Sequence, residues 1–189
     1  MGNCLTPKIG IELEAYAFIC APDGRITPYD TPGGVGYSTG NFADPRRFTD
    51  AIWNKAQDIG LPLDLITAEY DTPQYEFTLT FDTAVAHVDT VMLFRQMARE
   101  VALDHGIILS FLPKPIPGKG GNGFTTNDAI YGTAASLTDA LDDLAASTAL
   151  TSAVGAGLVE NHIFMKRAEV EKTATLDADA LRDWYIWHL

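Results

Sequence analysis

Four glutamates in the first half of the chain have the chemistry and the spacing of a metal site. Glu12 and Glu14 lie two residues apart in the stretch IGIELEAYAF, and Glu69 and Glu76 bracket the stretch EYDTPQYE. Residues i and i+2 of a strand point to the same face, so Glu12 and Glu14 would share one. Glu76 alternates with aromatic residues and would face away from them. Carboxylate oxygens are hard ligands, which favour Mg²⁺, Mn²⁺ or Ca²⁺ over softer metals.

These four charges would repel one another if neighbouring strands brought them together. Two like charges about 4 Å apart repel by roughly 4 kcal/mol at an effective dielectric constant of about 20. A bound cation, protonation or separation has to relieve this repulsion. The spacing alone leaves a second interpretation open, in which the four glutamates are solvated on an exposed sheet face.

Two strands, each with alternating apolar and polar residues, are predicted to position the glutamates. One covers Ile9–Ile19 and the other Gln74–Phe81, each with apolar side chains on one face. Between them we expect a long loop over Ala21–Asp44, which is either functional or contains a short hairpin. A helix should follow from Asp44-Pro45 to about Ile59, and then a strand near Leu65.

The later elements are mostly helical. The sequence predicts a helix from Thr83 to about His105, a short buried strand over Ile107–Leu112, a glycine-rich loop over Pro113–Gly123, and helices from Ser136, over Leu150–Glu171 and over Asp177–Leu189. Ser136 and Asp139 have the spacing of a capping box. Strands and helices therefore come first and helices alone last, which is typical of the α+β class.

Composition limits the classes of partner. The chain has 189 residues and a formal net charge of −12. This acidic balance argues against a nucleic-acid or anionic-membrane partner, since both need a basic surface. No apolar run approaches the roughly 20 residues of a membrane span, and residues 1–8 lack the layout of a signal peptide. Cys4 and Cys20 form no ligand cluster, and free thiols in a cytoplasmic protein are expected.

Three motifs in the chain resemble motifs of the glutamine synthetase family. The stretch IELE (11–14) with the following Tyr16 and Phe18 resembles its first catalytic strand, and EYDTPQYEF (69–77) is similar to its E-x-x-PGQ-x-E motif. The stretch HGIILSFLPKPIPGKGGNG (105–123) resembles its substrate loop with the sequence PKP, and the final stretch resembles its C-terminal helices. These segments occur in family order.

The resemblance implies roles for individual residues. Glu14, Glu69 and Glu76 match the carboxylate ligands of the first metal, beside the substrate amino acid, and Glu12 matches a ligand of the second metal, near the nucleotide. The resemblance to the family's substrate loop implies that Gly121, Asn122 and Gly123 bind the substrate. Nucleotide binding falls on Asn127 and on Lys114, for which a solvated loop lysine is the alternative. The implied cofactors are Mg²⁺ or Mn²⁺ with ATP, and the implied substrate is glutamate.

The resemblance also implies a fold. We expect a curved, mainly antiparallel sheet with helices packed on its outer face, followed by a C-terminal helical segment. Residues 1–189 would form a single shortened catalytic domain, with the sheet and the metal-site glutamates in 1–127 and the C-terminal helices in 136–189.

The chain departs from the family pattern at several positions. The two family histidines after the glycine-rich loop fall on Thr125 and Asn127, and a family asparagine falls on Gly120, with Asn122 close by. By the resemblance, the family's N-terminal β-grasp domain is expected to have no counterpart among residues 1–189. The family's arginine motifs should lie between about 127 and 136, where the chain reads DAIYGTAA, and none of its seven arginines matches them.

Two functions remain open at this point. The first is an ATP-dependent carboxylate–amine ligase that makes glutamine or a related amide, impaired when the chain acts alone. The second is a non-catalytic protein that binds a metal or metabolite and regulates or assembles with a full-length relative. In either case we expect a homo-oligomer or association with a glutamine-synthetase-like chain.

Overall fold

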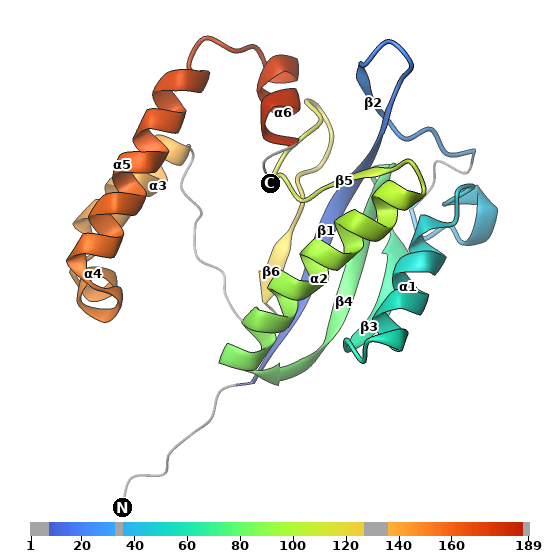
Figure 1. Cartoon of the computed structure of the whole chain (residues 1–189), viewed down its shortest axis with the longest axis horizontal. Coiled ribbons are helices and arrows are strands. Elements are labelled where there is room, and N and C mark those ends of the chain that lie inside the picture. Colours follow the sequence, from blue (N-terminus) through green and yellow to red (C-terminus); the bar gives the residue numbers. More distant parts are fainter. Residues whose placement is uncertain (1–7, 33–35, 127–135, 187–189) are drawn as a thin grey trace, which may run out of the picture. The chain divides into compact units, whose positions relative to one another are not determined.

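The computed structural model describes residues 8–32, 36–126 and 136–186. These residues group into two compact units. The first unit contains the described residues up to 126 together with those from Arg182, and the second contains residues 136–181. Figure 1 shows both units in colours that follow the sequence.

The first unit is built on an antiparallel sheet whose central strand is β1 (Lys8–Cys20). This strand pairs with β2 (Ile26–Pro28), β4 (Gln74–Thr83), β5 (Ile108–Ser110) and β6 (Phe124–Thr126). The strand β3 (Leu63–Ala68) completes the order β2-β1-β4-β3 by pairing with β4. The α+β class, the antiparallel sheet and the accompanying helices are as the sequence predicts.

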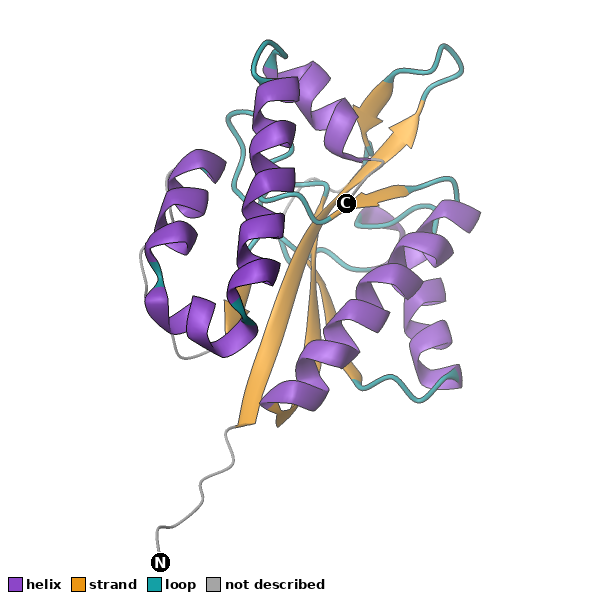
Figure 2. Cartoon of the chain, turned by 60° about the vertical axis from the view of Figure 1, so that its left-hand side comes forward, coloured by secondary structure: helices purple, strands orange, loops and turns teal. Residues whose placement is uncertain are grey.

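Two helices, α1 (Phe48–Asp58) and α2 (Ala84–Asp104), cover one face of this sheet (Figures 1 and 2). Alternate residues of β1 point into the core that the helices close, because the side chains of a strand alternate between its faces. The strands contribute Ile11, Leu13, Ala15, Tyr75, Phe77 and Leu79, and the helices contribute Phe48, Ile52, Val91, Phe94 and Ala98. This packing fixes which face of β1 is left for Glu12 and Glu14.

One alternative of the sequence prediction is present in the structure, and two elements differ from the prediction. The loop after β1 does contain a hairpin, because β2 pairs back onto β1. The helix α1 begins at Phe48 rather than near Pro45, since Arg47 has a left-handed backbone with φ of 57°. The strand β6 was not predicted, because three residues after a glycine-rich loop carry no alternating pattern.

The second unit is helical. It contains α3 (Leu137–Ala146), α4 (Thr148–Val154), α5 (Ala156–Thr173) and the start of α6 (Ala178–Ile186). The N-cap half of the predicted capping box is present, because the backbone N–H of Asp139 donates to the Ser136 hydroxyl at 3.1 Å, and that hydroxyl donates to Asp139 Oδ2 at 2.8 Å. The helix predicted over 150–171 is divided at Gly155, whose φ of 94° no α-helix accommodates.

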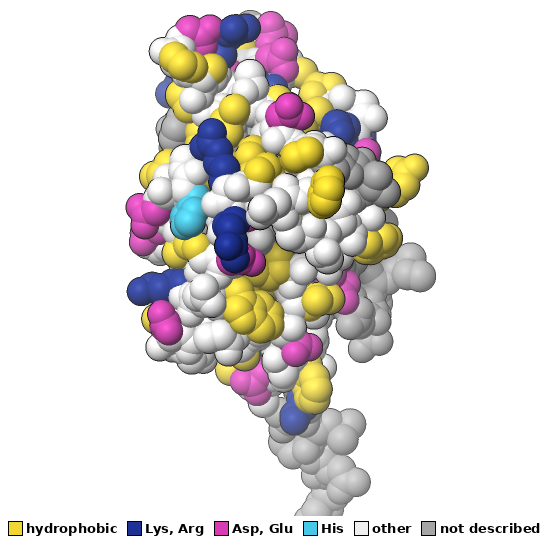
Figure 3. Space-filling view, turned by 90° about the vertical axis from the view of Figure 1, so that its right-hand side faces the viewer, with side chains coloured by type: hydrophobic (Ala, Val, Ile, Leu, Met, Phe, Trp, Pro, Cys, Tyr) yellow, Lys and Arg dark blue, Asp and Glu magenta, His cyan; other side chains and the backbone are white. Residues whose placement is uncertain are grey.

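The described surface is mixed in character. Figure 3 shows one face of the molecule, on which acidic, basic and apolar side chains alternate. None of the described helices is both long and apolar enough to span a membrane.

Candidate metal centre

The carboxylate face of β1 is built from direct cross-strand pairs with β4. Glu14 stands opposite Glu76, Glu12 stands opposite Thr78, and Tyr16 stands opposite Gln74. Directly opposed side chains of antiparallel strands lie about 5 Å apart at their Cβ atoms. The register therefore puts two acidic side chains together on the sheet face that the helices leave uncovered.

Glu69 reaches the same place from the end of β3. Its backbone N–H donates to the carbonyl of Gln74 at 2.8 Å, which closes the turn between β3 and β4. Glu14, Glu69 and Glu76 are all half-buried, and each offers one carboxylate oxygen within 4.8 Å of the others. The structure thus brings together three of the four glutamates that the sequence singles out.

The carboxyl group of Glu76 has a raised pKa in this arrangement. Burial raises the pKa of its carboxyl above the ordinary value, and the nearby charges of Glu12, Glu69 and Glu14 act in the same direction. The Thr78 hydroxyl, which donates to Glu76 Oε1 at 3.1 Å, partly opposes the shift. The ionised cluster is therefore destabilised unless positive charge is supplied.

Glu14 is held in position by a loop that crosses the carboxylate face. Its Oε2 accepts hydrogen bonds from the backbone N–H of Gly123 at 2.7 Å and from Nε2 of Gln74 at 2.9 Å. Its own backbone N–H donates to the carbonyl of Gly123 at 3.1 Å. Because one oxygen makes both of these side-chain contacts, Oε1 makes neither and is the oxygen better placed to serve as a ligand.

Gln74 and Asn122 fasten this loop to the sheet. Nε2 of Gln74 lies 3.0 Å from the carbonyl of Gly121 and 2.9 Å from Oδ1 of Asn122. Nδ2 of Asn122 donates to the carbonyls of Ser110 and Leu112 at 3.1 and 2.7 Å. The amide of Asn122 therefore serves the loop in this structure, and its role as a substrate contact stays a prediction.

Tyr16 and Asp71 hold the loop one residue earlier. The Tyr16 hydroxyl donates to the carbonyl of Gly120 at 3.0 Å, and the N–H of Gly120 donates to Asp71 Oδ2. Burial raises the pKa of Tyr16 to about 12, with Asp71 and Glu14 adding to the shift. Tyr16 is therefore a neutral hydrogen-bond donor at physiological pH.

Two glycines of this loop lie so close to neighbouring atoms that a side chain would not fit without a shift. A Cβ atom on Gly121 would lie 2.9 Å from the carbonyl oxygen of Pro113, and one on Gly123 would lie 3.1 Å from Glu14 Oε1. Any larger residue at Gly123 would push against a carboxylate that two donors already hold. The glycines thus let the backbone itself contact the cluster.

The remaining predicted residues are not part of the three-carboxylate cluster. Glu12 is half-buried on the same face, and its register partner on β6 is Thr125, the position of the first family histidine. Lys114 is exposed and has no ion pair within the described chain. Asn127 lies outside the described residues.

Sequence reasoning missed three residues that shape the site: Tyr16, Asp71 and Gln74. The parity that places Glu14 on the carboxylate face also places Tyr16 there, which was the available signal. Gln74 likewise shares the face of Glu76. Nothing in the local pattern indicates the contact of Asp71 with Gly120, which joins residues 49 positions apart.

Comparison with known proteins identifies the family of this chain. The chain matches the family described as glutamine synthetase, catalytic domain, over residues 5–133. It is 29% identical to a glutamate–methylamine ligase of Methyloversatilis universalis, over 60% of this chain and 26% of that protein. It is 34% identical to a glutamine synthetase of Frankia alni, over 65% of this chain and 36% of that protein.

A solved structure described as apo GmaS without ligand superposes with a TM-score of 0.54 and 27% identity, over 63% of this chain and 28% of that one. The chain spans between a quarter and somewhat over a third of the length of these relatives. The matched residues 5–133 contain the whole sheet and all four glutamates. This chain belongs to the glutamine synthetase family, through that family's catalytic domain.

Proposed function

We propose that Glu14, Glu69 and Glu76 bind one divalent cation, Mg²⁺ or Mn²⁺. One observation carries the proposal: three carboxylates from separate parts of the chain each offer an oxygen within 4.8 Å of the others. Within the described residues none of the three forms an ion pair with a Lys, Arg or His side chain. A hard divalent cation fits such a set in both charge and ligand preference.

Glu12 is proposed as a ligand of a second cation on the same face. It lies two residues from Glu14 on β1, and the residue opposite it on β6 is a threonine. One carboxylate does not complete a metal site. A second cation here would need further ligands from a bound nucleotide or from another chain.

The wider function that we propose is a part in ATP-dependent joining of glutamate to an amine. The relatives are named glutamine synthetase and glutamate–methylamine ligase, and one solved relative is described as a complex with ADP. A divalent cation, when bound, neutralises phosphate oxygens in such chemistry. In this chain Glu14, Glu69 and Glu76 would hold that cation, and Gln74 with Gly123 would keep Glu14 in place.

The arginines support a second candidate, metal binding without turnover. Phosphoryl-transfer sites use cationic clamps on the transferred group. Five arginines are engaged elsewhere: Arg25 with Asp23, Arg47 with Asp50, Arg167 with Asp142, Arg182 with Asp183, and Arg46 with two carbonyls after α2. In this second form the chain would work within a homo-oligomer or beside a full-length relative that provides the clamp.

Phosphate release at high protein concentration tests the two candidates. The assay contains Mn²⁺ or Mg²⁺, ATP, glutamate and either ammonium or methylamine. Release that needs both glutamate and an amine, and that is lost in the Glu14→Gln, Glu76→Gln double variant, supports the ligase. Metal binding without release supports the non-catalytic candidate, and the absence of both contradicts each of them.

A matched control separates the site from general charge removal. Glu160→Gln with Glu171→Gln removes two exposed carboxylates from α5, in the second unit. This control should behave as the unmodified chain does. Glutamine is chosen for the site variants because its carbonyl can still accept the hydrogen bonds of Gln74 and Gly123.

A further inference from the structure

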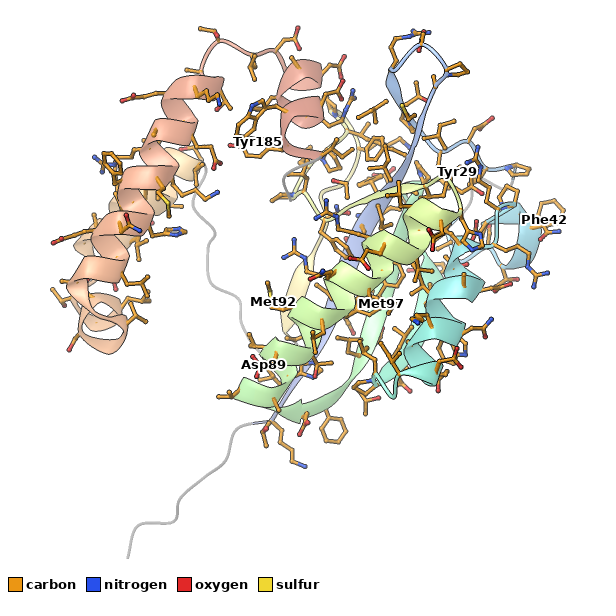
Figure 4. All side chains as sticks on the ribbon, viewed as in Figure 1. Tyr29, Phe42, Asp89, Met92, Met97 and Tyr185 are labelled. Atoms are coloured by element: carbon orange, nitrogen blue, oxygen red, sulfur yellow. The ribbon has the colours of Figure 1, made fainter. Side chains whose placement is uncertain are left out.

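A cavity lies on the first unit, along α2 and β5. Its volume is about 550 Å³, within the range of small-molecule sites. The α2 wall runs from Met92 to Leu103, and the other walls come from Ile107–Leu109 and Ile186. Met92 is labelled on α2 in Figure 4, whereas Met97 lines the separate groove toward α1. The cavity shares no residue with the carboxylate cluster.

Two arginines that form no ion pair with any described residue line this cavity. Arg95 and Arg99 are one helical turn apart on α2, where like charges repel each other. Within the described chain neither makes a hydrogen bond or an ion pair, although the other five arginines all do. The chain has 25 acidic and 13 basic residues, so two arginines without a carboxylate stand out against an excess of acid.

The surroundings keep the two guanidinium groups available. The nearest acidic residue along α2, Glu100, accepts a hydrogen bond from Gln96 at 3.3 Å. The guanidinium of Arg95 lies over the ring of Phe111, with its Cζ 5.2 Å from the ring centroid, which is a cation–π contact. Burial lowers the pKa of Arg95, and the charge of Arg99 adds to this effect. A bound anion would supply negative charge that stabilises both charged guanidinium groups.

Besides the two arginines, Gln96 and Glu100 are the polar residues of the lining, and the other lining residues are apolar. Met92 and Leu103 are 61% and 58% exposed and offer uncovered apolar surface, and the inner wall includes the buried Ile107 and Ile186. An inorganic ion would leave this surface in contact with water. The lining therefore suits a ligand that has both a charged group and a hydrocarbon body.

We propose that this cavity binds a small organic anion, with a carboxylate or phosphate group between Arg95 and Arg99 and an apolar body against Met92, Leu103 and Ile186. Arginine donates paired N–H groups to either oxyanion. The site is independent of the proposed metal centre, so either can fail without the other.

Calorimetric titration with octanoate and octyl phosphate tests the proposal, with butyrate, inorganic phosphate and octylammonium as comparison probes. Octanoate, octyl phosphate or both should bind, while the comparison probes bind at least tenfold more weakly. The stronger of the two octyl anions identifies the head group. Binding of octylammonium as tight as that of the anions, or no binding of either octyl anion up to about 10 mM, overturns the proposal.

Matched variants locate the binding. Arg95→Gln with Arg99→Gln should weaken anion binding about tenfold or more, since charge-assisted hydrogen bonds are lost. Arg25→Gln with Arg167→Gln removes the same charge from two exposed ion pairs and should change affinity less than about twofold. Equal weakening in both double variants contradicts the proposal.

A second pair of variants does not depend on the arginines being dispensable for folding. Leu103→Glu adds a carboxylate to the cavity wall at an exposed position, and Leu93→Glu adds one elsewhere on α2, at a residue that is 66% exposed. The thermal unfolding midpoints of both variants should remain close to that of the unmodified chain. Leu103→Glu should abolish anion binding and Leu93→Glu should preserve it; the reverse pattern overturns the assignment.

Discussion

Glu14 on β1 and Glu76 on β4 are direct cross-strand partners, so the register itself forces two carboxylates together. Glu69 joins them through the turn that its backbone closes with Gln74. Opposed like charges destabilise a sheet by about 0.2–1 kcal/mol. The chain keeps this arrangement and adds a glycine-rich loop that orients Glu14, which is the behaviour expected of a site for a cation.

Relief of this repulsion should stabilise the metal-free protein. We expect Glu76→Gln to raise the free energy of unfolding at pH 7 by about 0.5–1 kcal/mol, because it removes a half-buried charge that faces two others. Urea denaturation in the presence of EDTA measures the change. Glu171→Gln on α5 is the matched control and should have little effect. A loss of stability in Glu76→Gln would mean that the ionised cluster is not under strain.

Gly123 should matter for metal affinity more than for stability. A methyl group there would meet Glu14 Oε1 at 3.1 Å and displace the oxygen that we assign to the metal. Gly123→Ala should weaken Mn²⁺ binding about tenfold and lower the free energy of unfolding by about 1 kcal/mol. Gly157→Ala in α5, where a methyl group meets nothing within 4 Å, is the control. Unchanged Mn²⁺ affinity in Gly123→Ala would count against the placement of Glu14.

Gln74 should contribute to the free energy of unfolding as well as to the position of Glu14. Its side chain is 4% exposed and lies within hydrogen-bond distance of Glu14, Gly121 and Asn122. Gln74→Leu should cost about 1–3 kcal/mol in urea denaturation, since it removes a buried amide and three partly buried polar groups lose a partner. The exposed Gln57 on α1 provides the comparison, and Gln57→Leu should stay within about 0.5 kcal/mol of the unmodified chain. Similar effects of the two substitutions would contradict the network.

His87 should make stability depend on pH. The residue is fully buried in α2, and neither ring nitrogen has a hydrogen-bond partner in the described structure. Burial lowers the pKa of His87, with Asp82 opposing the shift. The unfolded chain therefore binds a proton that the folded chain resists, so stability is complete above about pH 6.5 and falls below it, by at most about 1.4 kcal/mol per pH unit.

Urea denaturation between pH 5.5 and 7.5 tests this dependence. His87→Leu should flatten the loss of stability toward low pH, whereas His162→Leu, at an exposed position of α5, should leave the slope unchanged. Parallel curves for His87→Leu and the unmodified chain would show that His87 is not the group responsible.

The sequence predicts the carboxylate face better than the groups that orient it. Strand parity places Glu12, Glu14 and Glu76 on one side because the apolar residues between them must enter the core. The contacts of Glu14 with Gln74 and Gly123 join residues 60 and 109 positions apart. Such contacts depend on the tertiary register, which no local pattern encodes.

The predicted start of α1 was wrong for a related reason. The start of α1 at Phe48 depends on Asp44, whose buried carboxylate accepts hydrogen bonds from the backbone N–H and hydroxyl of Thr49, and on the left-handed backbone of Arg47. The Asp44-Pro45 pair suggested an earlier start, because Pro is favoured in the first turn of a helix. Here the capping contact spans five residues and moves the start of the helix later.

The most direct test of the metal centre is calorimetric titration of Mn²⁺ into the metal-free chain, with the Glu14→Gln, Glu76→Gln variant in parallel. We predict binding near one equivalent in the unmodified chain and a loss of at least about a hundredfold in affinity in the variant, as expected when two of three charged ligands are neutralised. Equal affinity of the two proteins, or no binding to the unmodified chain up to millimolar Mn²⁺, would contradict the assignment of Glu14, Glu69 and Glu76 as a metal site.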